Sequence, residues 1–257
     1  MSSIFTGLTT EQVADLSTAQ IASLTTEDIS GIATEQLVAL TAIQVPILST
    51  LIVASLVTEQ VAALATEQIV ALTTRQVQAL ETADISVLGT AQVRALETTD
   101  IAVLKTEQVV ALTTAQMSAL TTAQIVALTT AQVKAIETSD VAALSTAQIV
   151  AVQTADVAAL TNAQVVALTT AQIASLTAAQ IVALTTAQVS SLELSDVAAL
   201  TTAQIQKLAA DDFLALGSAQ IEALTTAQTL ALTAAQIIAL TTAQVRALET
   251  EDLAALS

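Results

Sequence analysis

Leucine recurs every eight residues along the whole chain. Every residue whose number is a multiple of eight, from Leu8 to Leu256, is Leu, except Ile32, Ile136 and Val152, and no insertion or deletion interrupts the register. A fixed short period is typical of repeat architectures, in which a unit too small to bury its own apolar face depends on its neighbours. We therefore expect residues 1–257 to form a single elongated repeat domain of 32 octads.

The octad reads as a helix start. In residues 119–132, A-L-T-T-A-Q-I-V-A-L-T-T-A-Q, Thr121 is placed to cap a helix and Gln124 to occupy its third position. Ser or Thr at the N-cap with Gln three residues later is the capping-box pattern, and Leu120 with Ile125 has the spacing of a hydrophobic staple. The octad therefore predicts a helix that restarts in each unit.

The period excludes one continuous helix. Eight residues at ~100° each overshoot two helical turns by about 80°, so a Leu stripe would spiral around a straight helix. The spacing also does not match a coiled-coil heptad. We predict an all-α solenoid, or superhelix, of very short capped helices. A β-solenoid is the alternative, because Thr, Ile and Val favour strands, although the chain has only four Gly residues for turns.

A longer period is superimposed on the octad. The fourth residue after the octad Leu is Gln in 22 octads and Asp in eight, and these Asp residues recur at intervals of 56 in two series. The two explanations are duplication of a 56-residue segment and a superhelix that returns to the same face after seven octads. Clustered carboxylates suit hard cations, so Glu81, Asp84, Glu97 and Asp100 are candidate Ca²⁺ ligands; dipole-compensating surface charge is the simpler interpretation.

The repeat is most degraded between residues 42 and 56. Pro46 lies in mid-octad, Ile52 replaces the usual Gln, and Leu51, Ile52 and Val53 form an uncharged run. Pro removes a backbone donor and ends or kinks a helix. This stretch is either a packing irregularity or an apolar contact patch, a possible interface of Pro46, Leu51, Ile52 and Val53. We accordingly divide the chain into a divergent part, 1–56, and regular repeats, 57–257.

Composition argues against several classes of function. The chain has no Cys and no His, and only two aromatic residues, Phe5 and Phe213, so thiolate or imidazole metal sites and the commonest general base are absent. Six scattered basic residues against 23 acidic ones, a net charge of −17, make a poor surface for nucleic acid. We expect no enzyme, no cofactor, no nucleic-acid partner and no small-molecule substrate.

The sequence does not assign a compartment. Residues 1–16 lack a basic region followed by an apolar one, which predicts that no Sec-type signal peptide is present; a cell-surface or extracellular position would require another route. The uncharged run 37–57 has the length of a transmembrane span, but it contains Thr41, Gln44 and Pro46, and the octad register continues through it. We predict no membrane span.

The chain resembles the long bacterial proteins built from tandem L-T-x-x-Q octapeptides. The resemblance covers essentially the whole chain, through motifs such as Leu8-Thr9-Thr10-Glu11-Gln12 and Leu128-Thr129-Thr130-Ala131-Gln132, although the prolines of the L-T-P-E-Q variants are missing. It implies a repeat architecture of unassigned activity. We predict a non-catalytic structural scaffold that forms homo-oligomers or fibres by end-to-end or lateral contact; ice binding through Thr arrays is the alternative.

Overall fold

The computed structural model describes residues 4–248, and all regular secondary structure in that range is helical. Its contacts divide the chain into two compact units, Met1–Ala135 and Ile136–Ser257, which we describe separately. The prediction of an all-α solenoid of short helices is confirmed. The β-solenoid alternative is not supported, since no strand occurs among residues 4–248.

The helices of the first unit each occupy one octad. They are α1 (Thr10–Ala14), α2 (Thr18–Ala22), α3 (Thr26–Ser30), α4 (Thr34–Val38), the 3₁₀-helix η1 (Val45–Ile47), α5 (Thr50–Ala54), α6 (Thr58–Ala63), α7 (Thr66–Ala71), α8 (Thr74–Ala79), α9 (Thr82–Val87), α10 (Thr90–Ala95), α11 (Thr98–Val103), α12 (Thr106–Val110), α13 (Thr114–Ala119), α14 (Thr122–Ala127) and α15 (Thr130–Ala135).

The second unit continues the same series. Its helices are α16 (Thr138–Ala143), α17 (Thr146–Ala151), α18 (Thr154–Ala159), α19 (Asn162–Val166), α20 (Thr170–Ser175), α21 (Ala178–Ala183), α22 (Thr186–Ser190), α23 (Leu194–Ala199), α24 (Thr202–Ile205), α25 (Ala210–Ala215), α26 (Ser218–Glu222), α27 (Thr226–Leu230), α28 (Ala234–Ala239) and α29 (Thr242–Ala247).

Each α-helix starts at the second residue after the octad Leu, whereas its last residue varies from the fifth to the seventh. For α14, the N-cap Thr121 is extended (φ −72°, ψ 158°), and Leu128 closes the helix with ψ 137°. The Leu backbone N–H still bonds to the Ile125 carbonyl at 3.2 Å. In α14 the octad Leu is therefore the C-cap of one helix and also the residue before the next N-cap, which ties the two helices to the eight-residue period.

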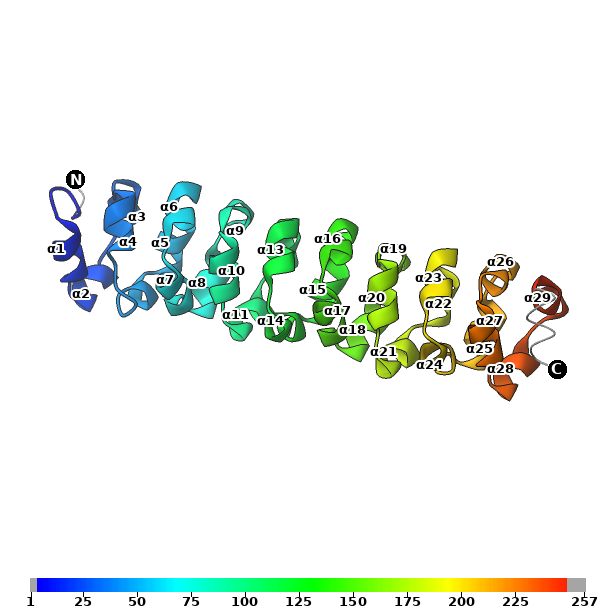
Figure 1. Cartoon of the computed structure of the whole chain (residues 1–257). Coiled ribbons are helices and arrows are strands. Elements are labelled where there is room, and N and C mark those ends of the chain that lie inside the picture. The colour runs from blue at the N-terminus through cyan, green and yellow to red at the C-terminus, as the bar shows by residue number, and fades with distance from the viewer. Residues whose placement is uncertain (1–3, 249–257) are drawn as a thin grey trace. The chain divides into compact units, whose positions relative to one another are not determined.

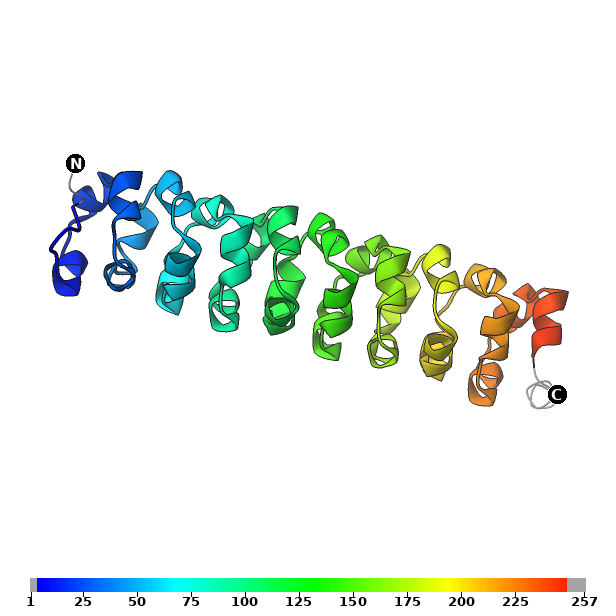
Figure 2. The same cartoon turned by 90° about the horizontal axis from the view of Figure 1, so that it is seen from above.

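Stacking supplies the stability that isolated helices of this length lack. Within each unit a helix packs against the helix three octads further on, as α10 packs on α13 and α20 on α23 (Figure 1). The apolar core of each unit comes from the octad Leu and from the Ile or Val five residues later: Leu120 is 4% exposed and Ile125 2%. Figure 2 shows the stacked layers of each unit from above.

None of the helices between residues 4 and 248 has the length and apolar character needed to cross a bilayer. The uncharged run 37–57 is divided among α4, η1 and α5. Its length comes from three consecutive octads, so it does not form a continuous helix.

Candidate functional site

The most specific chemistry in the molecule belongs to the repeated glutamine. Gln124 is 2% exposed, and its Oε1 accepts the backbone N–H of Thr121 at 2.9 Å. The Thr121 hydroxyl lies 3.2 Å from the Gln124 backbone nitrogen, from which it accepts a hydrogen bond, completing the predicted capping box. The predicted N-cap arrangement is therefore confirmed, and it uses the Oε1 end of the Gln side chain.

The other end of the same side chain joins two layers. Gln124 Nε2 donates to the carbonyl oxygens of Val93 at 2.9 Å and Leu96 at 2.8 Å, which lie 31 and 28 residues earlier, at the C-terminus of α10. We call this arrangement, Oε1 on its own N-cap and Nε2 on the carbonyls four octads earlier, a glutamine joint. The joint gives the Leu96 carbonyl a partner in a buried layer, and it adds a second donor to the Val93 carbonyl, which also accepts the Leu96 N–H at 3.3 Å.

Glutamine joints recur with nearly constant geometry in both units. In the first unit, Gln76 Nε2 lies 2.8 Å from the carbonyl oxygens of both Val45 and Leu48. In the second, Gln236 Nε2 lies 2.7 Å from that of Ile205 and 2.8 Å from that of Leu208. Sequence reasoning assigned Gln only to the cap and missed this contact. The signal was present: Glu, which could accept the N-cap N–H equally well, never occupies this position of the octad.

Two spacings describe the contacts between octads within each unit. A helix packs on the helix three octads away and is joined through Gln to the helix four octads away, so each turn takes between three and four octads. One spacing of each kind adds up to seven octads, which equals the 56-residue interval of the aspartates. Duplication of a 56-residue segment gives the same interval, so both explanations of the spaced aspartates stay predictions.

Aspartate keeps the cap and loses the joint. Asp84 Oδ2 accepts the Glu81 N–H at 3.0 Å, and Asp100 Oδ2 accepts that of Glu97 at 3.2 Å, but a carboxylate has no N–H to donate to the earlier layer. Burial raises the pKa of Asp84, Asp100 and Asp196; in each, a backbone hydrogen bond opposes the shift, and the charge of the acidic N-cap residue adds to it.

The four candidate Ca²⁺ ligands lie in two separate capping pairs. Glu81 pairs with Asp84 and Glu97 with Asp100; both Asp side chains are buried and both Glu residues exposed. Across residues 4–248, no three acidic side chains lie close enough together to hold a metal ion. The related pair Glu249 and Asp252 lies outside the described residues. These contacts fit the simpler interpretation, in which the carboxylates serve the first turns of their helices.

The degraded stretch 42–56 keeps its core and exposes other residues. Ile52 is 2% exposed and Val53 0%, so these two pack in the interior and do not belong to a surface patch. Pro46 is half-buried and shortens its octad to the 3₁₀-helix η1. Leu51, at 74%, is the one fully exposed member of the predicted interface set. The stretch thus combines a shortened helix with exposed apolar side chains, since Ile43 is also 75% exposed.

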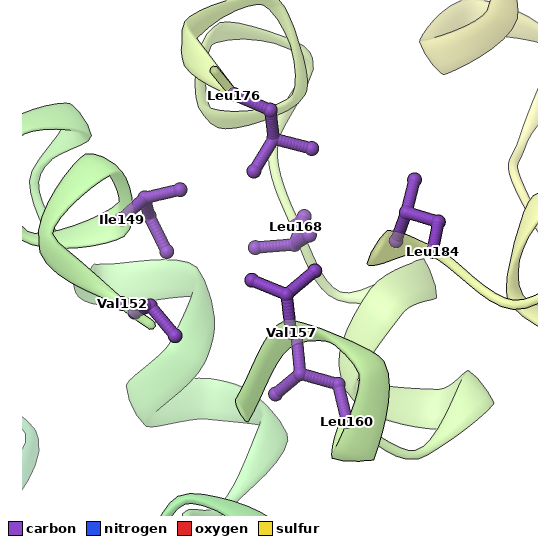
Figure 3. Close-up of a pocket in the computed structure, with 7 residues that line it drawn as sticks. All are labelled: Ile149, Val152, Val157, Leu160, Leu168, Leu176 and Leu184. Carbon is purple, nitrogen blue, oxygen red and sulfur yellow. The ribbon is translucent and has the colours of Figure 1, made fainter. Parts of the chain in front are cut away.

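A small apolar cavity lies beside Val152, the one octad position that is occupied by Val in place of Leu. It lies in the second unit and is lined by Ile149, Val152, Val157, Leu160, Leu168, Leu176 and Leu184, whose side chains converge in Figure 3. The volume is about 20 Å³, room for roughly one water, and all seven lining side chains are aliphatic. Such a space is a packing defect, because ligand sites are larger and carry a few convergent polar groups.

The second Thr of the octad has a different role from the first. Thr122 is exposed on the first residue of α14, and the cap is made by Thr121 instead. In an Asp-bearing layer, Thr186 Oγ1 donates to Asp212 Oδ1 at 3.0 Å. The predicted role of the first Thr as the cap is thus confirmed, and the second Thr, as at Thr122, lies exposed outside the cap.

A comparison with known protein families agrees with this architecture. The model of the ALTTAQ repeat matches six overlapping segments, residues 77–114, 110–136, 133–170, 166–194, 189–226 and 207–242. No curated protein matches the chain. The matched segments cover residues 77–242 without a gap and contain both the capping boxes and the glutamine joints, and the resemblance to tandem octapeptide proteins is confirmed: the chain belongs to the ALTTAQ repeat family.

Proposed function

We propose that this protein is a non-catalytic structural scaffold. The observation that carries the proposal is the glutamine joint, because it connects successive turns by the same contact in octad after octad. Such a unit can be repeated without new interactions, as in other quasi-one-dimensional proteins. Catalysis instead needs a singular arrangement of groups, and the acidic, hydroxyl and amide side chains here all recur with the repeat.

We further propose that the scaffold self-associates end to end. Gln12 and Gln20 cap their helices, through Thr9 and Ser17, but are exposed, and among residues 4–248 their Nε2 groups meet no carbonyl of another layer. At the other edge of the described chain, the core positions Ile237 and Val245 are 39% and 40% exposed.

Sedimentation velocity over a range of protein concentrations tests this proposal. We expect the wild-type protein to form larger species as concentration rises. The double variant Gln12→Glu/Gln20→Glu, which keeps the cap acceptors but removes the donors, should remain monomeric. The control Ala115→Glu/Ala123→Glu adds the same charge at exposed positions where other octads carry Glu, and should behave as wild type. A wild-type protein that stays monomeric throughout would contradict end-to-end association.

Ice binding is a second candidate, favoured by the outward-facing second Thr. Its hydroxyl is outside the capping box, as Thr122 shows, and the neighbouring Ala123 is also exposed, which gives a small, mildly apolar surface in each octad. Thermal hysteresis measured with concentrated protein decides the matter. Ice shaping that is lost when several second Thr residues are changed to Lys would support it, and absence of ice shaping would exclude it.

A further inference from the structure

Asp196 stands where its neighbours in the repeat carry a glutamine joint. Gln188 Nε2 donates to the carbonyls of Val157 at 2.9 Å and Leu160 at 2.8 Å, and Gln204 makes the same pair of bonds one octad further on from Asp196. The carbonyls in the corresponding places for residue 196 belong to Val165 and Leu168. An ionised carboxylate can only accept hydrogen bonds, so it presents another acceptor to this layer.

The carboxyl group is buried and incompletely bonded. Asp196 is 2% exposed, and its Oδ2 is a buried oxygen without a hydrogen-bond partner. In the octads before and after it, Gln188 and Gln204 have hydrogen bonds at both Oε1 and Nε2. A buried polar atom without a partner is unusual in a native protein and points to a change of state.

None of the described helices in contact with α23 carries a positive charge near this carboxylate. The elements packed against α23 are α20 and α26, and the octads joined to it in the four-octad register are α19 and α27. Helices α19, α20 and α27 contain no ionisable side chain, α26 contributes Glu222, and the octad of Asp196 itself contributes Glu193. All the facing charges are therefore negative, and they disfavour the ionised form.

We infer that Asp196 is an acid-responsive joint, at which uptake of one proton from solvent removes a buried charge and strengthens the contact between successive turns of the second unit. The neutral carboxyl also gains an O–H donor, which the ionised form lacks. At neutral pH the contact between turns at Asp196 is weaker than a glutamine joint, and at acidic pH its strength becomes more similar to that of a glutamine joint.

The sign of the pH dependence follows from the direction of the shift. Burial raises the pKa of Asp196 in the folded chain above its ordinary value, so the folded state holds the proton more tightly than the unfolded state. The stabilisation is then fully present below the unfolded pKa, near 3.8, and is lost as pH rises through the raised folded pKa. The joint therefore tightens on acidification from neutral pH.

Urea denaturation of the full chain at about pH 7 and about pH 4 tests the inference with two variants. Asp196→Gln restores the consensus octad and Asp196→Asn removes the charge at nearly constant size. We expect both to raise the urea midpoint at pH 7, and most of the difference from wild type to disappear at pH 4. The control Glu107→Gln removes the same charge from an exposed site of the first unit and should show no such pH-dependent difference.

Hydrogen exchange at the backbone amides of α23 gives a local readout. In the wild-type protein, opening of this helix should become rarer on acidification once exchange is corrected for its intrinsic pH dependence, and Asp196→Gln should remove this change. Two results would overturn the inference: a difference between Asp196→Gln and wild type that is the same at both pH values, or a variant no more stable than wild type at pH 7.

Discussion

The stretch 41–56 and the regular octads from 105 to 136 form the same kind of layer in two different ways. In the regular octads every unit has an α-helix, a Gln whose Oε1 accepts the N-cap N–H, and a glutamine joint. In 41–56, Pro46 reduces one helix to the 3₁₀-helix η1, and Ile52 occupies a joint position with an apolar side chain. Yet the octad register passes through both without a shift.

What the two regions share is therefore what fixes the repeat. Val45 is 2% exposed and Leu48 6%, values like those of the regular core, and Gln44 still donates to the Leu16 carbonyl at 2.7 Å. The helix of a single octad can shorten, and one joint can be replaced by apolar packing. The two buried apolar positions persist in each case, which indicates that they hold the layers in register.

Truncation of matched core residues gives the largest expected effect. Val45→Ala in the irregular stretch and Val93→Ala in a regular octad should each destabilise the protein by about 2 kcal/mol, from lost burial and the cavity left behind. Denaturant unfolding of both variants measures the two values. Val70→Ala, at a side chain 47% exposed, is the control and should have little effect. A negligible effect of Val45→Ala beside a large one at Val93 would break the comparison.

A polar residue at a buried core position should lower stability, and its replacement should restore it. Thr229 occupies the position of the buried Ile or Val, is 0% exposed, and its Oγ1 has no hydrogen-bond partner. Thr229→Val keeps the shape and removes the buried hydroxyl, so we expect a gain of about 1 kcal/mol in the free energy of unfolding. Thr226→Val, the same change on the exposed first residue of α27, should leave stability nearly unchanged. Destabilisation by Thr229→Val would show that the hydroxyl has a role.

The smallest expected effect concerns a missing cap. Ala65 is the N-cap of α7, with the extended backbone (φ −69°, ψ 155°) of a Thr cap but no side-chain hydrogen bond. Ala65→Thr should stabilise the protein by about 0.5–1 kcal/mol, as measured by thermal or urea unfolding. Ala62→Thr, in the interior of α6, should instead destabilise by a few tenths of a kcal/mol. Equal effects of the two changes would argue against side-chain capping as the source of the octad's Thr.

The capping box can be predicted from the sequence, whereas the glutamine joint between turns cannot. Thr121 and Gln124 reveal the helix start because a capping box depends only on residues three apart. The hydrogen bond from Gln124 to Leu96 spans 28 residues and depends on how the octads wind, which no local pattern specifies. The burial of Ile52 could not be predicted for the same reason. An apolar residue at a position that is otherwise polar suggests a surface patch until the neighbouring layer is known.

The most direct test of the glutamine joint compares two glutamines that make the same cap bond, one exposed and without a second partner, the other buried and joined to an earlier turn. Gln20 accepts the Ser17 N–H at 2.9 Å but has no carbonyl from another turn, whereas Gln124 makes the same cap bond and also donates to Val93 and Leu96. Urea unfolding should show that Gln20→Ala costs about 1 kcal/mol and that Gln124→Ala costs at least about 2 kcal/mol more, because it leaves buried polar groups unpaired. Equal losses at the two positions would contradict the account.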